Sequence, residues 1–395
     1  MENRITLAPQ MTRRASLGLA IGGLVAASAG AATRGPRFAT IDAAAAKLVD
    51  DHRVPGLSIS LMRAGKLIYS KGFGWANLET KTPVTPTSVF RIASNTKQFT
   101  AAAVMLLQEE GKLSVDDKLD KFFPDFPRGT EVSLRQVLTH TAGLGNYTRV
   151  KPPREFFQIA RRDYDPDALY AAMKKTDPLY LFEPGTNWEY VNTGYVLLGL
   201  LVQKVAGEPF GAYLKRRLFD PAGMRDTALD DTTPVVPNRV SGYSAHPRST
   251  TDFDNASYIS MTYVGGAGAI RSTTDDLCRW RAALFGGRLV SPASLKEMTT
   301  PARLKDGSLP MTGPPSARRH VNYGFGLIIS TMEGRPCIRH TGHINGFQSE
   351  LRTFPDEQIT YAFLSNIDNF DSHRPREEEI DALTDVAVKA GLNHA

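Results

Sequence analysis

Ser94 and Lys97 form the pair of side chains in this sequence whose types and spacing best suit covalent catalysis. A serine hydroxyl is a weak nucleophile at neutral pH, so it needs a neighbouring group that accepts its proton. The segment that follows, residues 101–111, is rich in strong helix formers and closes on a glycine. Because residues three apart share a helix face, the sequence predicts that Lys97 lies beside the Ser94 hydroxyl in the first turn of a helix.

Two later blocks carry further residues that could do chemistry. Tyr190 and Asn192 follow a Pro-Gly turn at residues 184–185 and are expected to lie in a loop, and residues 340–342 read His-Thr-Gly. A tyrosine can transfer a proton, and an asparagine amide can hold a substrate carbonyl or amide group. A lone Ser-x-x-Lys is common by chance, whereas three such blocks in this order are specific.

Together the blocks resemble the motifs of the penicillin-recognising serine hydrolases, in particular the class C β-lactamases, the DD-carboxypeptidases and the family VIII carboxylesterases. The resemblance covers nearly the whole chain after the N-terminal segment. Its motifs are Ser-x-x-Lys, Tyr-x-Asn and Lys/His-Thr-Gly, which fall here on Ser94 and Lys97, Tyr190 and Asn192, and His340, Thr341 and Gly342.

The resemblance also implies a role for each of these residues. Ser94, Lys97 and Tyr190 would be catalytic. The substrate would be held by Asn192, His340, Thr341 and Gly342. The backbone N–H groups of Ser94 and His343 would form the oxyanion hole, and Ser94 would gain from the positive end of its helix.

Two residues could accept the Ser94 proton. Burial disfavours a charged ammonium, so it would make Lys97 a neutral base. Tyr190 could instead act as a phenolate if the Lys97 ammonium stabilises it. The sequence leaves both routes open and predicts a coupled pair, so pH–rate data would report apparent pKa values of the pair.

His340 stands where many β-lactamases carry lysine, and the histidine form resembles certain DD-carboxypeptidases and other members that are not lactamases. A neutral imidazole binds a carboxylate less firmly than an ammonium does. The sequence therefore favours a peptidase or esterase, with a class C-like β-lactamase as the alternative. A non-catalytic cell-wall binding protein is a second alternative, although such a protein need not keep Ser94, Lys97 and Tyr190.

Other histidines could suggest different chemistry. His140 could complete a Ser–His–Asp triad, but its Leu-Thr-His-Thr-Ala-Gly-Leu context resembles a structural element of the family, and Ser94 lacks the Gly-x-Ser-x-Gly elbow. We expect His140 to be structural. His340 and His343 are three apart on a predicted strand, where alternate residues share a side, so we expect no metal and no cofactor.

Composition is typical of a globular enzyme that acts on a small-molecule or peptide acyl substrate. The 395 residues are 42% hydrophobic, and the net charge is only +6. No run of like charges interleaved with aromatic residues is present, which argues against nucleic acid as a partner. The two cysteines, Cys278 and Cys337, are better explained as buried thiols than as a disulfide.

The N-terminus has the pattern of an export signal. Residues 12–17, Thr-Arg-Arg-Ala-Ser-Leu, precede an apolar run over residues 17–32, and Ala-Ser-Ala at residues 27–29 offers a cleavage site. The pattern resembles a twin-arginine signal, with an ordinary secretory signal or an uncleaved anchor as alternatives. We expect residues 1–32 to be a signal peptide, and a periplasmic or secreted protein with no membrane span after processing.

Hydrophobic periodicity and turn signals predict an α/β (α+β) fold, in one domain over residues 33–395, and the resemblance implies that this fold is of the β-lactamase/transpeptidase type. Strands from both ends of the chain should form one antiparallel sheet flanked by helices, because the turns between consecutive strands are short. The predicted strands are residues 56–62, 66–72, 323–330, 335–340, 347–354 and 359–365, and the flanking helices are 41–49 and one from about 376.

Residues 33–85 and 301–395 would form the α/β lobe, and residues 86–300 a mainly helical lobe. The site should lie where the lobes meet, roofed by residues 146–181. The sequence thus predicts an exported serine hydrolase that acts on an amide or ester through an acyl-enzyme on Ser94. It would resemble a D-Ala carboxypeptidase, a D-peptidase or an esterase.

Overall fold

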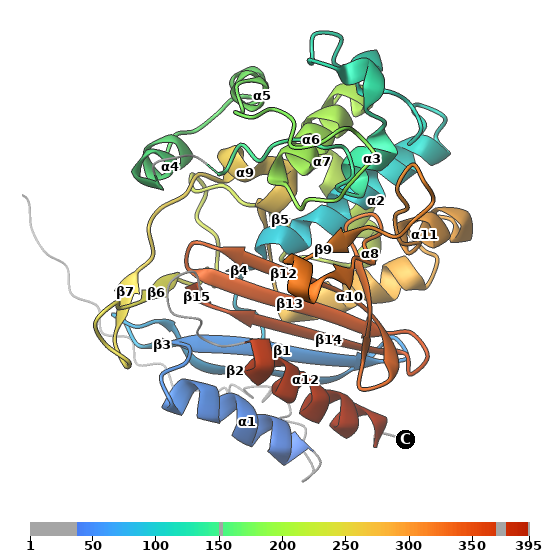
Figure 1. Cartoon of the computed structure of the whole chain (residues 1–395). Helices are drawn as coiled ribbons and strands as arrows, with labels where there is room; N and C mark the ends of the chain where they lie inside the picture. The colour runs from blue at the N-terminus through green and yellow to red at the C-terminus, as the bar shows by residue number, and fades with distance from the viewer. Residues whose placement is uncertain (1–37, 150–152, 369–376, 394–395) are drawn as a thin grey trace, which may run out of the picture. The chain divides into compact units, whose positions relative to one another are not determined.

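A computed structural model describes residues 38–149, 153–368 and 377–393. The predicted signal peptide, residues 1–32, lies outside the described residues. The main sheet is antiparallel, with strand order β11-β12-β13-β14-β1-β2-β3 (Figure 1). Its strands are β1 Gly56–Arg63, β2 Lys66–Asn77, β3 Thr82–Pro83, β11 Ile328–Met332, β12 Arg335–Ile344, β13 Phe347–Phe354 and β14 Ile359–Ser365.

Strands from the two ends of the chain meet at the centre of this sheet, as expected. Strand β1 pairs with β14, with Ile59 opposite Phe363. Every residue of β13 and β14 is buried, which explains why their sequences are not a simple alternation of apolar and polar residues. The turns between β12, β13 and β14 are short, and short turns require antiparallel neighbours.

Helices cover both faces of the sheet. Helices α1 (Ala39–Asp50) and α12 (Glu377–Leu392) pack on one face, where Tyr361 and Phe363 join their apolar side chains in one core cluster. Helix α10 (Thr274–Phe285) packs on the other face with Ala362 and Leu364 (Figure 1). The alternation along β14 therefore divides its side chains between two hydrophobic cores.

The middle of the chain is mainly helical. Its helices are α2 Thr96–Glu109, α3 Leu134–Leu138, α4 Pro153–Ala160, α5 Pro166–Lys174, α6 Asn192–Ala206, α7 Phe210–Leu214, α8 Asp220–Ala222, α9 Met261–Gly268, α10 and α11 Pro292–Met298. Short strands complete the fold: β4 Phe90–Arg91, β5 Ala228–Leu229, β6 Tyr243–Ala245, β7 Phe253–Asn255, β8 Ile270–Ser272, β9 Met311–Thr312, β10 Arg319–His320 and β15 Ile367–Asp368. Helix α2 is buried along almost its whole length and packs against α6 and α9.

Three local predictions differ from the structure. Strand β11 begins at Ile328 instead of residue 323, because Gly326 adopts a positive φ of 68° and its Cα lies so close to Lys97 that an added Cβ would be 2.7 Å from the Lys97 carbonyl. Strand β12 continues beyond His340 to Ile344. Asn192 begins helix α6, whereas the sequence placed it in a loop.

Two further findings concern the cysteines and the length of the apolar helices. Cys278 and Cys337 are free, buried thiols, as expected. No helix in the described part of the chain is long and apolar enough to cross a membrane.

Candidate active site

Ser94 lies in a short 3₁₀ turn, Ala93–Asn95, that runs directly into α2. The sequence placed Ser94 in the first α-helical turn, but the α-helix begins two residues later. Ala93 has φ = 48°, in the left-handed region that a residue with a side chain rarely adopts. Such a backbone costs of order 1–3 kcal/mol and persists only where the surrounding structure holds it.

A chain of buried side chains holds this turn. Trp280 Nε1 donates to Gln98 Oε1 at 2.6 Å, and Gln98 Nε2 donates to Asn95 Oδ1 at 2.9 Å. Asn95 Nδ2 donates to Ser349 Oγ at 2.8 Å, and Ser349 Oγ donates to the Ile92 carbonyl at 2.7 Å. The backbone around Ser94 is thus tied to α10 and β13. No spacing in the sequence indicated this connection.

Gly342 brings β12 against the same turn. A Cβ added at Gly342 would lie 2.3 Å from the Ile92 carbonyl oxygen, so only glycine fits without a shift of the backbone. Strand β11 pairs with β12 only up to Arg339, so the rest of that edge of β12 is not covered by β11. The part of β12 that carries the predicted His-Thr-Gly motif therefore passes directly beside the turn Ala93–Asn95, here called the nucleophile turn because it carries the predicted nucleophile Ser94.

Lys97 is fully buried beneath Ser94. Its Nζ lies 3.1 Å from Ser94 Oγ, 2.9 Å from Asn192 Oδ1 and 2.9 Å from the Ala267 carbonyl oxygen. Burial lowers the pKa of Lys97 well below its ordinary value, because the low-dielectric interior disfavours the ammonium. The structure thus brings Ser94, Lys97 and Asn192 together.

The partners of Lys97 Nζ suit a neutral amine. The amide oxygen of Asn192 and the carbonyl of Ala267 can only accept hydrogen bonds, whereas the Ser94 hydroxyl can also donate. Asn192 Nδ2 donates to Thr148 Oγ1 at 3.3 Å, which keeps its oxygen towards the lysine. A neutral amine with two N–H groups and one lone pair fills this set, with the lone pair left for the Ser94 proton.

Tyr190 packs against the same amine, with Lys97 Nζ 4.8 Å from its ring centre. Burial raises the pKa of Tyr190, although a hydrogen bond with Ser94 opposes the shift. At neutral pH the phenol therefore keeps its proton, whereas the lowered pKa of Lys97 favours the neutral amine. Of the two routes that the sequence left open, the electrostatics favour Lys97 as the proton acceptor.

Ser94 opens into a cavity of about 400 Å³. Two other predicted site residues, Asn192 and His343, also line it. Thr148 and Phe156 contribute to its wall from the segment that was expected to roof the site, of which residues 150–152 are not described. Much of the remaining lining is apolar, from Phe156, Ile259, Val264 and Ile344.

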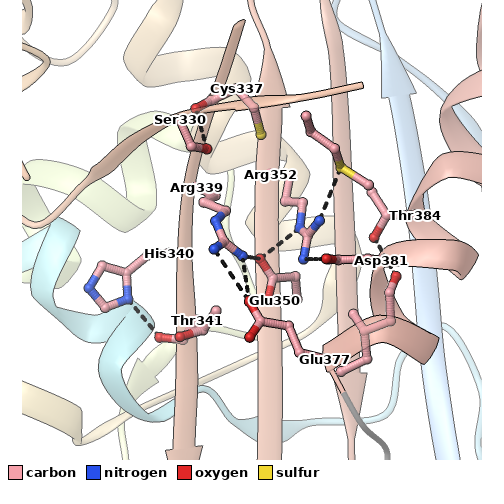
Figure 2. A network of polar contacts seen from close by, with 12 residues as sticks. Ser330, Cys337, Arg339, His340, Thr341, Glu350, Arg352, Glu377, Asp381 and Thr384 are labelled. Carbon is pink, nitrogen blue, oxygen red and sulfur yellow. Dashed lines mark hydrogen bonds and ion pairs between the residues drawn. The ribbon is translucent and has the colours of Figure 1, made fainter. Parts of the chain in front are cut away.

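His340 and Thr341 are not among the residues that line this cavity. His340 is only 2% exposed, and its Nε2 lies 3.0 Å from Tyr323 Oη. Its Nδ1 lies 2.6 Å from the Thr341 carbonyl oxygen (Figure 2). Burial lowers the pKa of His340 to about 3, so its imidazole is neutral. Both ring nitrogens are engaged within the protein, and substrate contact by His340 stays a prediction.

His140 belongs to an aromatic cluster around Lys97. Its buried ring lies 4.5 Å from the ring of Tyr190, 5.2 Å from that of Tyr195 and 4.8 Å from that of Tyr323. The Val191 N–H donates to His140 Nδ1 at 3.4 Å. These contacts suit the structural role expected for His140. The cluster supplies the apolar surroundings that lower the lysine pKa, and the sequence did not indicate Tyr195 or Tyr323 as part of it.

Within the described ranges, no group of three or more histidine, cysteine or acidic side chains is arranged to hold a metal ion. The side chains gathered around Ser94 are an amine, a phenol and an amide, from Lys97, Tyr190 and Asn192. These groups suit proton transfer and the binding of a carbonyl compound.

Comparison with known proteins supports this description. The profile of the Beta-lactamase family matches residues 41–385. A penicillin-binding protein of Bacillus subtilis is 30% identical over 81% of this chain and 69% of its own length. A D-aminopeptidase of Gluconobacter oxydans is 26% identical over 83% of this chain, which spans 59% of that enzyme.

A solved structure gives the same result for the fold. The D-amino acid amidase of Ochrobactrum anthropi superposes with a TM-score of 0.73 at 25% identity, covering 90% of this chain and 99% of that one. The architecture is therefore the β-lactamase/transpeptidase-like fold that the sequence predicted. The chain belongs to the beta-lactamase family of penicillin-recognising serine hydrolases.

Proposed function

We propose that this serine hydrolase acts on an amide or ester of a small acyl group through an acyl-enzyme on Ser94. The observation that carries the proposal is the buried Lys97 amine, 3.1 Å from Ser94 Oγ and otherwise bound to two pure acceptors. As Ser94 Oγ bonds to the substrate carbonyl carbon, its proton passes to Lys97 Nζ. Collapse of the tetrahedral intermediate releases the amine or alcohol, which takes up a proton.

Water then attacks the acyl-enzyme and releases the acid. Before this water attack, Tyr190 would pass its phenolic proton to the leaving group and regain a proton from the Lys97 ammonium, so Lys97 is neutral again. Lys97 would then take a proton from the attacking water and return it to Ser94 Oγ as the acid leaves. The backbone N–H groups of Ser94 and His343 would stabilise the oxyanion, a proposal supported by the position of both residues on one cavity. The Asn192 amide, which lines the cavity, would orient the substrate. Substrate contact by Thr341 and Gly342 of β12 stays a prediction, because neither residue lines the cavity.

The substrate class that we favour is a D-aminoacyl amide, peptide or ester. The relatives named D-aminopeptidase and D-amino acid amidase support this choice, and so does the partly apolar cavity of about 400 Å³. A β-lactamase is less favoured because position 340 offers a neutral, engaged imidazole instead of an ammonium. We also propose that the protein is exported, on the basis of the twin-arginine-like pattern in residues 12–32.

A hydrolysis assay tests the proposal. Purified protein is mixed with D-phenylalanine amide, its L-enantiomer and a short-chain p-nitrophenyl ester. We expect turnover of the ester and preference for the D-amide, both lost in Ser94→Ala and kept in Ser308→Ala, a matched variant at an exposed serine. Full activity in Ser94→Ala would overturn the assignment of the nucleophile.

Incubation with a penicillin separates the alternatives. A lasting penicillin adduct together with ester turnover supports the peptidase or esterase. Rapid loss of penicillin without a lasting adduct means a β-lactamase. A protein that neither forms an adduct nor turns over any of these substrates would be the non-catalytic binding protein, and the proposal would fail.

A further inference from the structure

A second cavity, of about 190 Å³, adjoins the catalytic one. Ser257 and Asn345 line both cavities and so form a shared wall between them. Asn345 Nδ2 donates to the Ser257 carbonyl at 3.1 Å, which links the two residues of this wall. None of the residues with proposed catalytic roles lines this second cavity. A group bound there would be one wall away from the space in front of Ser94.

The charged groups that line this cavity are three arginines and one carboxylate. Arg91 Nε lies 2.9 Å from Asp230 Oδ2, and Arg239 Nη1 lies 3.0 Å from Asp230 Oδ1. Arg271 stands directly opposite Arg91 in the β4–β8 pair. Like charges in directly opposed strand positions repel each other, so one carboxylate leaves excess positive charge here.

Arg271 is the least satisfied of the three. Its Nε is 3.7 Å from Asp230 Oδ1, and its Nε and Nη1 are buried without a hydrogen-bond partner among the described residues. Burial lowers the pKa of Arg271, so its cation is poorly compensated. Two further carboxylates, Asp231 and Asp226, act on it only through their charge, and Asp231 Oδ1 already accepts from the Thr233 N–H at 2.8 Å.

A buried cation without a partner is costly, and a planar guanidinium pairs best with a planar or tetrahedral oxyanion. We propose that this cavity is a binding site for a small oxyanion, a carboxylate or phosphate group, held by Arg91, Arg239 and Arg271. The group could be carried by an acyl substrate that extends from Ser94 past Asn345, or it could be a free anion. The substrate version rests on the function proposed above, whereas binding of a free anion does not.

The first test measures binding alone. Inorganic phosphate and glutarate are titrated into Ser94→Ala protein by calorimetry, and chloride at equal ionic strength is the reference. We expect saturable binding that weakens about tenfold or more in Arg271→Gln, the size of a lost charge-assisted hydrogen bond.

Arg239→Gln, at a more exposed arginine, should also weaken anion binding, and it replaces Arg271→Gln if that variant does not fold. The matched control Arg288→Gln, at an exposed arginine outside the cavity, should bind normally. No saturable binding, or equal loss in the control, would overturn the proposal.

The second test identifies the source of the anion. p-Nitrophenyl esters of dicarboxylic acids of increasing length are compared with their methyl-capped, neutral counterparts, using wild-type Ser94. The quantity compared is the ratio of kcat/KM for the charged ester to kcat/KM for its capped form. If the substrate carries the anion, this ratio exceeds one at one chain length, and Arg239→Gln or Arg271→Gln reduces it. If anions bind but the ratio stays near one at every length, the site takes a free anion and the substrate version is overturned. If the neutral esters are not hydrolysed, the proposed function fails while the binding result still stands.

Discussion

At the residue scale, the proposed acylation of Ser94 depends on the protonation state of Lys97. An ammonium at this place would hold three hydrogen bonds but could not accept the Ser94 proton. Lys97 is fully buried and its Nζ has no carboxylate partner among the described residues, so its pKa is lowered and the neutral, reactive amine is favoured. The same burial raises the pKa of Tyr190, which gives the two groups opposite roles at one pH.

Lys97→Arg tests this assignment. A guanidinium keeps its proton, so we expect kcat/KM for the ester to fall by ~10²–10⁴-fold, the usual size of general-base assistance. The control Lys121→Arg, at an exposed lysine, should be unaffected. In the wild type, kcat/KM should rise as pH rises through the lowered pKa of Lys97 and then level off. Near-normal activity of the Lys97→Arg protein would shift the role of base to Tyr190.

At the scale of elements, β13 and α10 hold the nucleophile turn through Ser349 and Trp280. Ser349 Oγ joins Asn95, directly before α2, to the Ile92 carbonyl, on either side of the strained Ala93. The role of Ser349 is to position Ser94, because Ser349 is not among the residues that line the cavity. Such positioning matters because small displacements of a nucleophile cost rate.

Ser349→Ala should therefore lower kcat more than it raises KM. We expect a destabilisation of about 1–3 kcal/mol, because two buried polar groups lose their partner. The hydroxyl-preserving Ser349→Thr should recover part of kcat. The control is Ser330→Ala. Ser330, on β11, donates to the backbone carbonyl of Cys337 on β12 and takes no part in the hydrogen bonds that hold the turn around Ser94, so kcat should not change. An equal fall of kcat in both alanine variants would contradict the positioning role.

The elements also show what sequence reasoning can reach. Strands β13 and β14 were predicted with their observed bounds because the turn residues Pro-Asp-Glu at 355–357 separate them. The contact between Ser94 and Lys97 followed from helical spacing alone. The Ala267 carbonyl reaches Lys97 from 170 positions away, and Tyr323 reaches His340 across a turn at Gly326. Such contacts depend on tertiary packing, which local periodicity does not encode.

At the scale of the whole molecule, a buried ion network ties α12 to the outer face of the sheet (Figure 2). Arg352 Nε lies 2.8 Å from Glu350 Oε1, and Arg352 Nη2 lies 2.6 Å from Asp381 Oδ1. The Arg352 and Glu350 side chains are 2% and 4% exposed. Burial raises the pKa of Glu350, so its carboxylate depends on the neighbouring guanidinium.

Arg352→Met should destabilise the fold by about 3–5 kcal/mol, because it leaves the Glu350 charge buried with only the more distant Arg339. The double variant Glu350→Gln/Arg352→Met should lose less, since the uncompensated charge is gone. Urea unfolding of Glu350→Gln, of Arg352→Met and of the double variant gives the free energy of coupling between the two side chains. Simple additivity of the two single changes would contradict the pairing.

The buried His340 makes stability depend on pH. Its pKa is about 3 in the folded protein and near 6.5 when exposed, so the unfolded chain binds a proton that the native state refuses. This contribution to stability is complete above pH 6.5 and is lost as pH falls towards 3, at about 1.4 kcal/mol per pH unit. Between pH 6 and 4, His340→Gln should reduce the slope of the unfolding free energy against pH by that amount, as measured by urea unfolding. His320→Gln, at an exposed histidine, should not change this slope.

The central claim is that Ser94 carries the acyl group during turnover. The most direct measurement is mass spectrometry of protein quenched in acid during hydrolysis of an activated ester, followed by peptide mapping. We predict one acyl group per chain on the peptide that contains Ser94, and none in Ser94→Ala. An acyl group on another residue, or unchanged acylation and turnover in Ser94→Ala, would contradict it.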